Sequence, residues 1–211
     1  MIPINKDFGI VIQSRLGSNR LPLKALLYFG GSTVIGYLIK SLIDAGVKKD
    51  YICVATSSSE LDNLLTDYIE SIDIKVIRGD EDNVLKRYQT VADETGFKNI
   101  VRLTGDNPLI DIDLISLCIK RHLKGNFALT TTRNIKNNLI KRYAPKGLSV
   151  DVLSSDALLS IDTDKCNNFE KEHVIPFFFS NFSVQIVKDY SSNRADMSID
   201  TIDDYKRLFK L

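Results

Sequence analysis

Between residues 8 and 123, short apolar runs alternate with longer segments in which apolar residues recur at helical spacing. The runs are continuously apolar and rich in β-branched residues, as is typical of strands buried on both faces of a parallel sheet. Since parallel neighbours are joined by crossover helices, this alternation predicts βαβ units and a mainly parallel sheet in an α/β fold. The expected strands are 8–13, 51–56, 74–77 and 99–104.

The segments between these runs carry helix signals. Val34, Leu38 and Leu42 recur at helical spacing, and Gly46 is a plausible stop after them. Ser59, followed three residues later by Asp62, resembles a capping signal. Two further helices are expected at 83–96 and 113–123. The helix after Ser59 is expected to present an apolar face made of Leu61, Leu64, Leu65, Tyr68 and Ile69.

After Gly125 the alternation becomes irregular. The stretch 133–145 is polar, basic and weakly patterned, and irregular segments of this length in compact proteins tend to be functional, as an active-site lid or an oligomer contact. No repeat, low-complexity tract or linker divides the chain, so we expect one Rossmann-like domain over 1–211. The remaining expected strands are 127–132, 148–153, 182–187 and 197–200, with helices at 157–161, near 169–179 and after 200.

The composition excludes several classes of protein. The net charge of +1 argues against general nucleic-acid binding, which usually requires a strongly basic domain. Three widely spaced cysteines, Cys53, Cys118 and Cys166, form neither a disulfide framework nor a zinc site. No signal-peptide pattern is present, and no apolar segment approaches the roughly 20 residues of a membrane span. We therefore expect a cytoplasmic protein that binds neither nucleic acid nor membrane.

The stretch Q-S-R-L-G-S-N-R-L-P-L-K, residues 13–24, places three cations around Gly17 directly after the first expected strand. Ligands of open α/β sheets bind beyond the carboxyl ends of the strands. Arg15 and Arg20 can form paired hydrogen bonds with a phosphate, and Lys24 adds a compact charge. A solvated basic loop explains the composition equally well. The chain lacks both the G-x-x-x-x-G-K-[ST] and the G-x-G-x-x-G pattern, which argues against P-loop hydrolysis and dinucleotide-dependent redox chemistry.

Two carboxylates follow other expected strands. Asp106 lies in the turn G-D-N-P after the strand 99–104, and Asp200 lies in S-I-D-T before the last helix. Asp106 is explained either as a turn former or as a functional acid. Asp200 is explained as a helix N-cap, as a second acid, or as both, because the two roles do not exclude each other. Mg²⁺ takes one or two carboxylates and completes its coordination with phosphate oxygens and water. A basic loop beside these acids therefore indicates a metal–triphosphate site.

Five segments resemble, in chain order, the motifs of the cytidylyltransferases that make CMP-activated sugars, and most closely their SpsF-like branch, related to the Kdo and acylneuraminate cytidylyltransferases. The segments are residues 13–24, R-G-D-E-D-N-V-L-K-R-Y (78–88), V-R-L-T-G-D-N-P-L-I-D (101–111), E-H-V-I-P (172–176) and S-I-D-T (198–201). The resemblance covers nearly the whole chain. It implies a nucleotide-diphosphosugar-transferase-like fold, a CTP site over the first loop and a homodimer.

The resemblance also implies residue roles. Arg15, Lys24 and Asp106 would be catalytic, and Asp106 with Asp200 would bind Mg²⁺. Arg142 and His173 would contact the acceptor, although Arg142, with Lys141 and Lys146, is equally explained as a solvated rim, and His173 as a structural histidine. Leu23 stands where the family usually has glycine. The residues expected to bind the nucleotide are Gln13, Ser14, Arg15, Gly17, Ser18, Arg20, Lys24, Thr56, Arg78, Gly79 and Asp106.

The implied reaction transfers CMP from CTP to a small acidic sugar, or to a phosphorylated or phosphonate acceptor, and releases pyrophosphate, for the synthesis of surface polysaccharide or glycoconjugate. The segments around 126–152 and 165–190 would supply acceptor contacts and the dimer interface. Two alternatives stay open: a non-catalytic nucleotide-binding protein of the same fold, and a nucleotidyltransferase that uses another nucleoside triphosphate.

Overall fold

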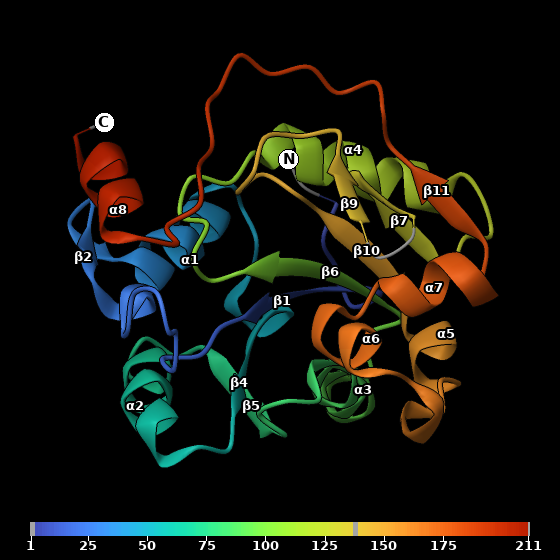
Figure 1. Ribbon diagram of the computed structural model, residues 1–211, viewed down its shortest axis with the longest axis horizontal. Coiled ribbons are helices and arrows are strands. Elements are labelled where there is room, and N and C mark those ends of the chain that lie inside the picture. Colours follow the sequence, from blue (N-terminus) through green and yellow to red (C-terminus); the bar gives the residue numbers. More distant parts are fainter. Residues whose placement is uncertain (1–2, 137–138, 211) are drawn as a thin grey trace.

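The computed structural model describes residues 3–136 and 139–210, so that positions 137–138 of the expected 126–152 element lie outside the described residues. A seven-stranded sheet forms the centre of the molecule (Figure 1), with strands in the order β11-β7-β10-β6-β1-β4-β5. Two short strand pairs accompany it, β2 (Tyr28–Phe29) with β3 (Ser32–Thr33) and β8 (Arg133–Lys136) with β9 (Leu139–Arg142). The strands of the main sheet are β1 (Phe8–Gln13), β4 (Ile52–Ser57), β5 (Lys75–Gly79), β6 (Asn99–Thr104), β7 (Leu129–Thr131), β10 (Asp151–Ser154) and β11 (Val184–Ile186).

Strand pairing confirms the expected mixed, mainly parallel sheet. β1 is parallel to both β4 and β6, β4 is parallel to β5, and β11 is parallel to β7. Among the described strands of the seven-stranded sheet, only β10 runs antiparallel to its neighbours, β6 and β7. Gln13, the last residue of β1, pairs with Ala55 of β4 and Thr104 of β6. The loops that follow β1 and β6 therefore leave the sheet side by side at the same edge.

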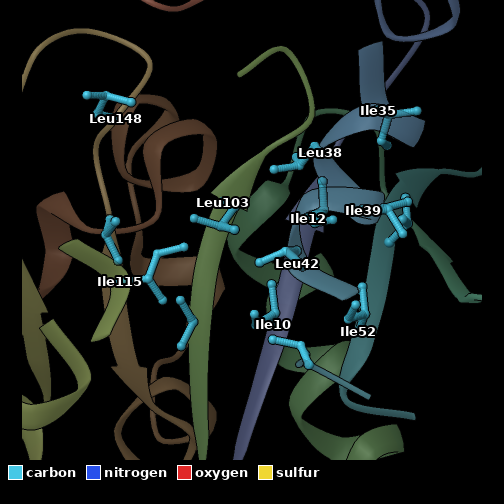
Figure 2. Close-up of a cluster of buried hydrophobic side chains, with 14 of the residues drawn as sticks. Ile10, Ile12, Ile35, Leu38, Ile39, Leu42, Ile52, Leu103, Ile115 and Leu148 are labelled. Atoms are coloured by element: carbon cyan, nitrogen blue, oxygen red, sulfur yellow. The ribbon is translucent and has the colours of Figure 1, made fainter. Parts of the chain in front are cut away.

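Helices cover both faces of this sheet, as the alternation of side chains along each buried strand requires. Ile10 and Ile12 of β1 pack in one apolar cluster with α1, α2 and α4, whereas Val11 packs on the other face with α3, α5 and α7. Figure 2 shows Ile10 and Ile12 beside the α1 side chains of the first cluster. The α-helices are α1 (Val34–Asp44), α2 (Asn63–Ser71), α3 (Val84–Thr95), α4 (Ile112–Leu123), α5 (Ser155–Leu159), α6 (Asn168–His173), α7 (Pro176–Asn181) and α8 (Ile202–Phe209).

The helix predicted near 169–179 is two helices, α6 and α7. The break is at Val174, whose φ of 67° lies outside the helical region. Pro176 opens α7. A proline has no backbone N–H to donate and its ring collides with the carbonyl four residues earlier, so α6 cannot continue through this position.

The predicted details of α2 are partly wrong. Ser59 makes no side-chain capping bond, and α2 begins four residues later at Asn63. Leu65 and Ile69 are buried, but Leu61 and Leu64 are exposed. Tyr68 is half-buried and packs against the same cluster as Leu65 and Ile69. The apolar face is therefore narrower than the sequence pattern suggests.

The segment 197–200, predicted as a strand, is not part of any described strand. It ends an irregular stretch that runs from β11 across the molecule toward α8 (Figure 1). The stretch predicted to be irregular at 133–145 instead contains the β8–β9 pair. None of the helices in the described residues is long and apolar enough to cross a membrane.

Candidate nucleotide and acceptor site

The loop that follows β1 is held in place by a buried carboxylate. Asp62 accepts a hydrogen bond of 2.7 Å from the backbone N–H of Leu16, in the middle of the loop. The same side chain accepts bonds from Thr56 Oγ1 at 2.9 Å and from the Ser57 N–H at 3.1 Å. Asp62 is only 1% exposed. It therefore ties the basic loop to the end of β4, a role that the capping interpretation of Ser59 and Asp62 missed.

Leu23 adopts a backbone conformation that favours glycine. Its φ of 60° and ψ of 13° lie in the left-handed region. A non-glycine residue pays about 1 kcal/mol or more for this conformation. The Leu23 N–H donates to the carbonyl of Leu16 at 3.1 Å, which closes the loop on itself. The loop is therefore closed immediately before Lys24, with Leu23 held in a strained conformation.

Lys24 joins the two predicted acids. Its Nζ lies 2.5 Å from Oδ2 of Asp106 and 3.0 Å from Oδ1 of Asp200. Arg20 Nη2 lies 2.9 Å from the same Asp200 oxygen, and Lys146 Nζ lies 2.6 Å from the other. The structure thus brings the basic loop next to Asp106 and Asp200, as predicted from the sequence, and adds Lys146, for which this contact was not predicted.

The irregular stretch before α8 delivers Asp200 to this point. Met197 N donates to the Lys146 carbonyl at 2.7 Å, and Ile199 N donates to the Asp106 carbonyl at 2.9 Å. Gly147 has a φ of +91°, and a β-carbon there would collide with the backbone of Met197. Close approach of the two chain segments therefore requires glycine at this position.

Asp200 is not the N-cap of the last helix, so that interpretation is wrong. Thr201 caps α8 in a reciprocal arrangement with Asp204. Burial opposes ionisation of Asp200, but the hydrogen bonds and charges of Lys146 and Lys24 outweigh it and lower its pKa to about 2. Asp200 is consequently a full carboxylate at neutral pH and is available to bind a cation.

The two carboxylates suit Mg²⁺. Oxygens of Asp106 and Asp200 converge on one cationic atom, Lys24 Nζ. The described residues contain no group of three or more potential ligands of the His, Cys, Asp or Glu type. Mg²⁺ is typically held by one or two carboxylates while phosphate oxygens and water fill its other positions. The pair therefore fits a metal that is bound together with a phosphorylated substrate.

Two adjoining cavities lie above this edge of the sheet. The smaller, the phosphate cavity, has a volume of about 310 Å³, and the larger has about 620 Å³. Gln13, Ser14 and Arg15 line both. The phosphate cavity is also lined by Gly17, Ser18, Asn19, Arg20, Lys24, Ala25, Thr104, Asp106 and Asp200. The larger cavity is also lined by Asp80, Glu81, Asp82, Asn83, Val84, Arg87, Asn168, Lys171 and Glu172.

Three residues expected to bind the nucleotide line neither of these cavities. Thr56 is buried and donates to Asp62. The Arg78 guanidinium donates to the backbone carbonyls of Ser57 and Ser59 at 3.0 and 2.7 Å. Gly79 packs against Arg87. In the structure these residues support the wall of the site, and the segment Asp80–Val84 that follows them faces the larger cavity instead.

A third cavity, of about 200 Å³, lies on the other side of Asp106 and Asp200. We call it the acceptor cavity. It brings together Arg142 and His173, the two predicted acceptor residues, and Lys146, whereas Lys141 does not line it. Burial lowers the pKa of His173, which favours a neutral imidazole. Its other lining residues are Arg102, Leu103, Thr104, Asp106, Asn107, Arg133, Gly147, Ser149, Ser198 and Asp200.

The buried charges beneath this cavity were not predicted from the sequence. Asp151 is 1% exposed and forms ion pairs with Arg102, at 3.0 Å, and with Arg133. Thr131 Oγ1 also donates to it, at 2.6 Å. Arg102 Nη2 in turn donates to Gln13 Oε1 at 2.9 Å. Burial opposes ionisation of Asp151, but the two guanidinium groups lower its pKa below the ordinary value.

This chain resembles known proteins over most of its length. The family model described as cytidylyltransferase matches residues 9–208. The spore coat polysaccharide biosynthesis protein SpsF of Bacillus subtilis is 27% identical over 96% of this chain and 85% of its own. A 3-deoxy-manno-octulosonate cytidylyltransferase of Rickettsia massiliae is 32% identical over 74% of this chain and 63% of its own. The structure of a cytidylyltransferase from Leptospira borgpetersenii superposes with a TM-score of 0.83 at 29% identity, covering 96% of this chain and 84% of that one.

Proposed function

Because this chain belongs to the cytidylyltransferase family, we propose that it transfers CMP from CTP to a small acidic acceptor and releases pyrophosphate. The observation that carries this proposal is the meeting of Lys24 with Asp106 and Asp200 between the phosphate cavity and the acceptor cavity. The name of the similar SpsF protein supports a role in making surface polysaccharide or glycoconjugate.

In this proposal the basic loop holds the triphosphate. The side chains of Arg15, Arg20 and Lys24 line the phosphate cavity, and they would neutralise charge on the α-phosphate and on the departing pyrophosphate. Arg15 also lines the larger cavity, which has the volume to receive the nucleoside. Gln13 and Ser14 line both cavities, so they would contact the nucleotide where its nucleoside meets its triphosphate. Gly17 and Ser18 line only the phosphate cavity of these two, so they would contact the triphosphate.

Asp106 and Asp200 would hold Mg²⁺, which supplies positive charge to the phosphates when bound. With Asp106 and Asp200 engaged in this way, the Lys24 ammonium would donate to a phosphate oxygen in place of its present ion pairs. On the other side, Arg142 and His173 would hold the acceptor with one oxygen toward the α-phosphate. Positioning of the two substrates and neutralisation of the phosphate charge would account for most of the rate enhancement, as in phosphoryl transfer generally.

We also propose that the chain acts as a single domain in a homodimer. The β8–β9 pair forms a separate two-stranded sheet, and Leu139 in β9 is 75% exposed. An exposed large apolar side chain on such a pair is suited to contact a second copy. The expected elements 126–152 and 165–190 include this pair and the helices beside the acceptor cavity.

The direct test is pyrophosphate release by the purified protein with Mg²⁺ and CTP, across a panel of acidic sugars, alditol phosphates and phosphonates. We expect release with CTP and a competent acceptor, and much less with UTP or GTP. Preference for another nucleotide would replace CTP in the proposal. Tight CTP binding without release from any acceptor would support a non-catalytic protein of the same fold.

A further inference from the structure

We propose that the acceptor carries a dianionic phosphoryl group, as a phosphate monoester or a phosphonate, and that an oxygen of this group attacks the α-phosphorus of CTP. This inference rests on the proposed function and narrows its acceptor class. It excludes a sugar acid whose only charge is a carboxylate. The evidence is the charge, the rigidity and the unpaired polar atoms of the acceptor cavity.

The first observation is the balance of charge. Four cationic side chains line the acceptor cavity, and Lys24 lies against its two lining carboxylates, Asp106 and Asp200. Asp151 beneath the cavity is the third carboxylate in contact with these cations. Arg20 also pairs with Asp200. Six cations therefore face three carboxylates, an excess of three positive charges. A phosphoryl dianion offsets two of these charges, whereas a carboxylate offsets one. The four lining cations are Arg102, Arg133, Arg142 and Lys146.

The second observation is that like charges are placed opposite each other. Arg133 of β8 and Arg142 of β9 are direct cross-strand partners, and both line the acceptor cavity. Like charges in this arrangement destabilise a strand pair. Asp151 binds Arg133 but is not paired with Arg142 in the described ion pairs. An anion in the cavity that contacts both guanidinium groups would remove this repulsion.

The guanidinium groups are also held rigidly. The ion pairs with Asp151 fix Arg102 and Arg133, whose side chains are only 7% and 12% exposed. Fixed guanidinium donors match the oxygens of a phosphoryl group and lose little freedom on binding. Flexible surface cations do not have this property.

The third observation concerns uncharged atoms. Asn107 Oδ1 and Ser149 Oγ are buried without a hydrogen-bond partner in the described structure, and both residues line the acceptor cavity. Buried polar atoms are costly unless they are paired. A hydroxyl group of the acceptor can donate to the Asn107 oxygen and accept from the Ser149 hydroxyl. The cavity volume of about 200 Å³ restricts the acceptor to a small molecule.

This acceptor class also suits the chemistry. The second pKa of a phosphate monoester is about 6, so its oxygen is mostly unprotonated at neutral pH. The oxygen forms a bond to the α-phosphorus, the bond from that phosphorus to the bridging oxygen breaks, and the electron pair leaves with pyrophosphate. No proton has to be removed, so no general base is required. The product contains a new P–O–P linkage.

Binding measurements test the inference without relying on turnover. With Mg²⁺ and a non-transferable CTP analogue, calorimetry should show glycerol 3-phosphate or 2-hydroxyethylphosphonate binding at least about 10-fold more tightly than glycerate, which has a carboxylate in place of the phosphoryl group. The ester and the phosphonate together show which source of the dianion is preferred. Equal or tighter binding of glycerate, or binding of neither dianion, would overturn the inference.

A variant localises the effect. Arg142→Gln alters an exposed strand residue and should weaken binding of the better dianion by about 10- to 100-fold. Lys141→Gln, the neighbouring exposed residue that does not line the cavity, is the matched control and should leave binding unchanged. Equal losses in the two variants, or no loss in Arg142→Gln, would contradict the assigned contact.

The linkage in the product separates this inference from the proposed function. Phosphorus NMR should show two mutually coupled signals from a P–O–P linkage. A phosphodiester to a carbon hydroxyl, without phosphorus coupling, would disprove phosphoryl attack while leaving CMP transfer intact. If CTP does not bind and no acceptor yields pyrophosphate, it is the proposed function that fails.

Discussion

The Asp106→Asn variant should lose CTP-dependent pyrophosphate release by about 10³-fold, because the substitution removes one of two carboxylates that converge on the cation position. The fold should survive, since the Asp106 side chain is 24% exposed and its structural bond to Ile199 uses the backbone carbonyl. Turnover at saturating CTP and a thermal unfolding curve measure the two effects separately.

Asp113→Asn is the matched control. Asp113 is an exposed acid in the first turn of α4, and it lines none of the three cavities described above. We expect this variant to keep wild-type turnover. If Asp106→Asn keeps more than about a tenth of wild-type turnover while CTP remains saturating, Asp106 does not have the role assigned to it.

The Asp151→Asn variant should lower the free energy of unfolding by about 3–5 kcal/mol, because it leaves Arg102 and Arg133 buried without a counter-charge. Total stabilities of about 5–15 kcal/mol are typical, so this loss is a large fraction. Urea denaturation followed by circular dichroism measures it.

Asp156→Asn provides the comparison, because Asp156 is an exposed acid in the first turn of α5, close to Asp151 in sequence. The free energy of unfolding of Asp156→Asn should stay within about 0.5 kcal/mol of the wild-type value. A loss below about 1 kcal/mol for Asp151→Asn would mean that the buried cluster does not depend on its carboxylate.

Much of the site was predictable because it lies where short motifs follow strands. Parallel strands end at a common edge, so the loop after β1 and the turn after β6 had to be neighbours once both strands were recognised. Asp200 lies beside Lys24, as predicted, although its predicted strand is absent from the described strands. Its position depends on two backbone hydrogen bonds and on Gly147, none of which leaves a periodic pattern in the sequence.

The buried charges were not predictable from the sequence. Asp151 meets Arg102 because β10 runs antiparallel to β6 in a particular register, and it meets Thr131 through the register with β7. Sequence periodicity assigns a residue to a strand but does not choose its partner across the sheet. Asp62 was missed for a related reason, since its bond to Leu16 joins residues 46 positions apart.

The central claim is that Mg²⁺ and CTP bind where Lys24 now joins Asp106 and Asp200. A crystal structure with a non-transferable CTP analogue and Mn²⁺, located by its anomalous scattering, tests this claim most directly. We predict a metal ion bound by both carboxylates, the triphosphate over residues 14–24, and Lys24 Nζ turned toward a phosphate oxygen. A metal or triphosphate bound elsewhere, with the ion pairs of Lys24 intact, would contradict it.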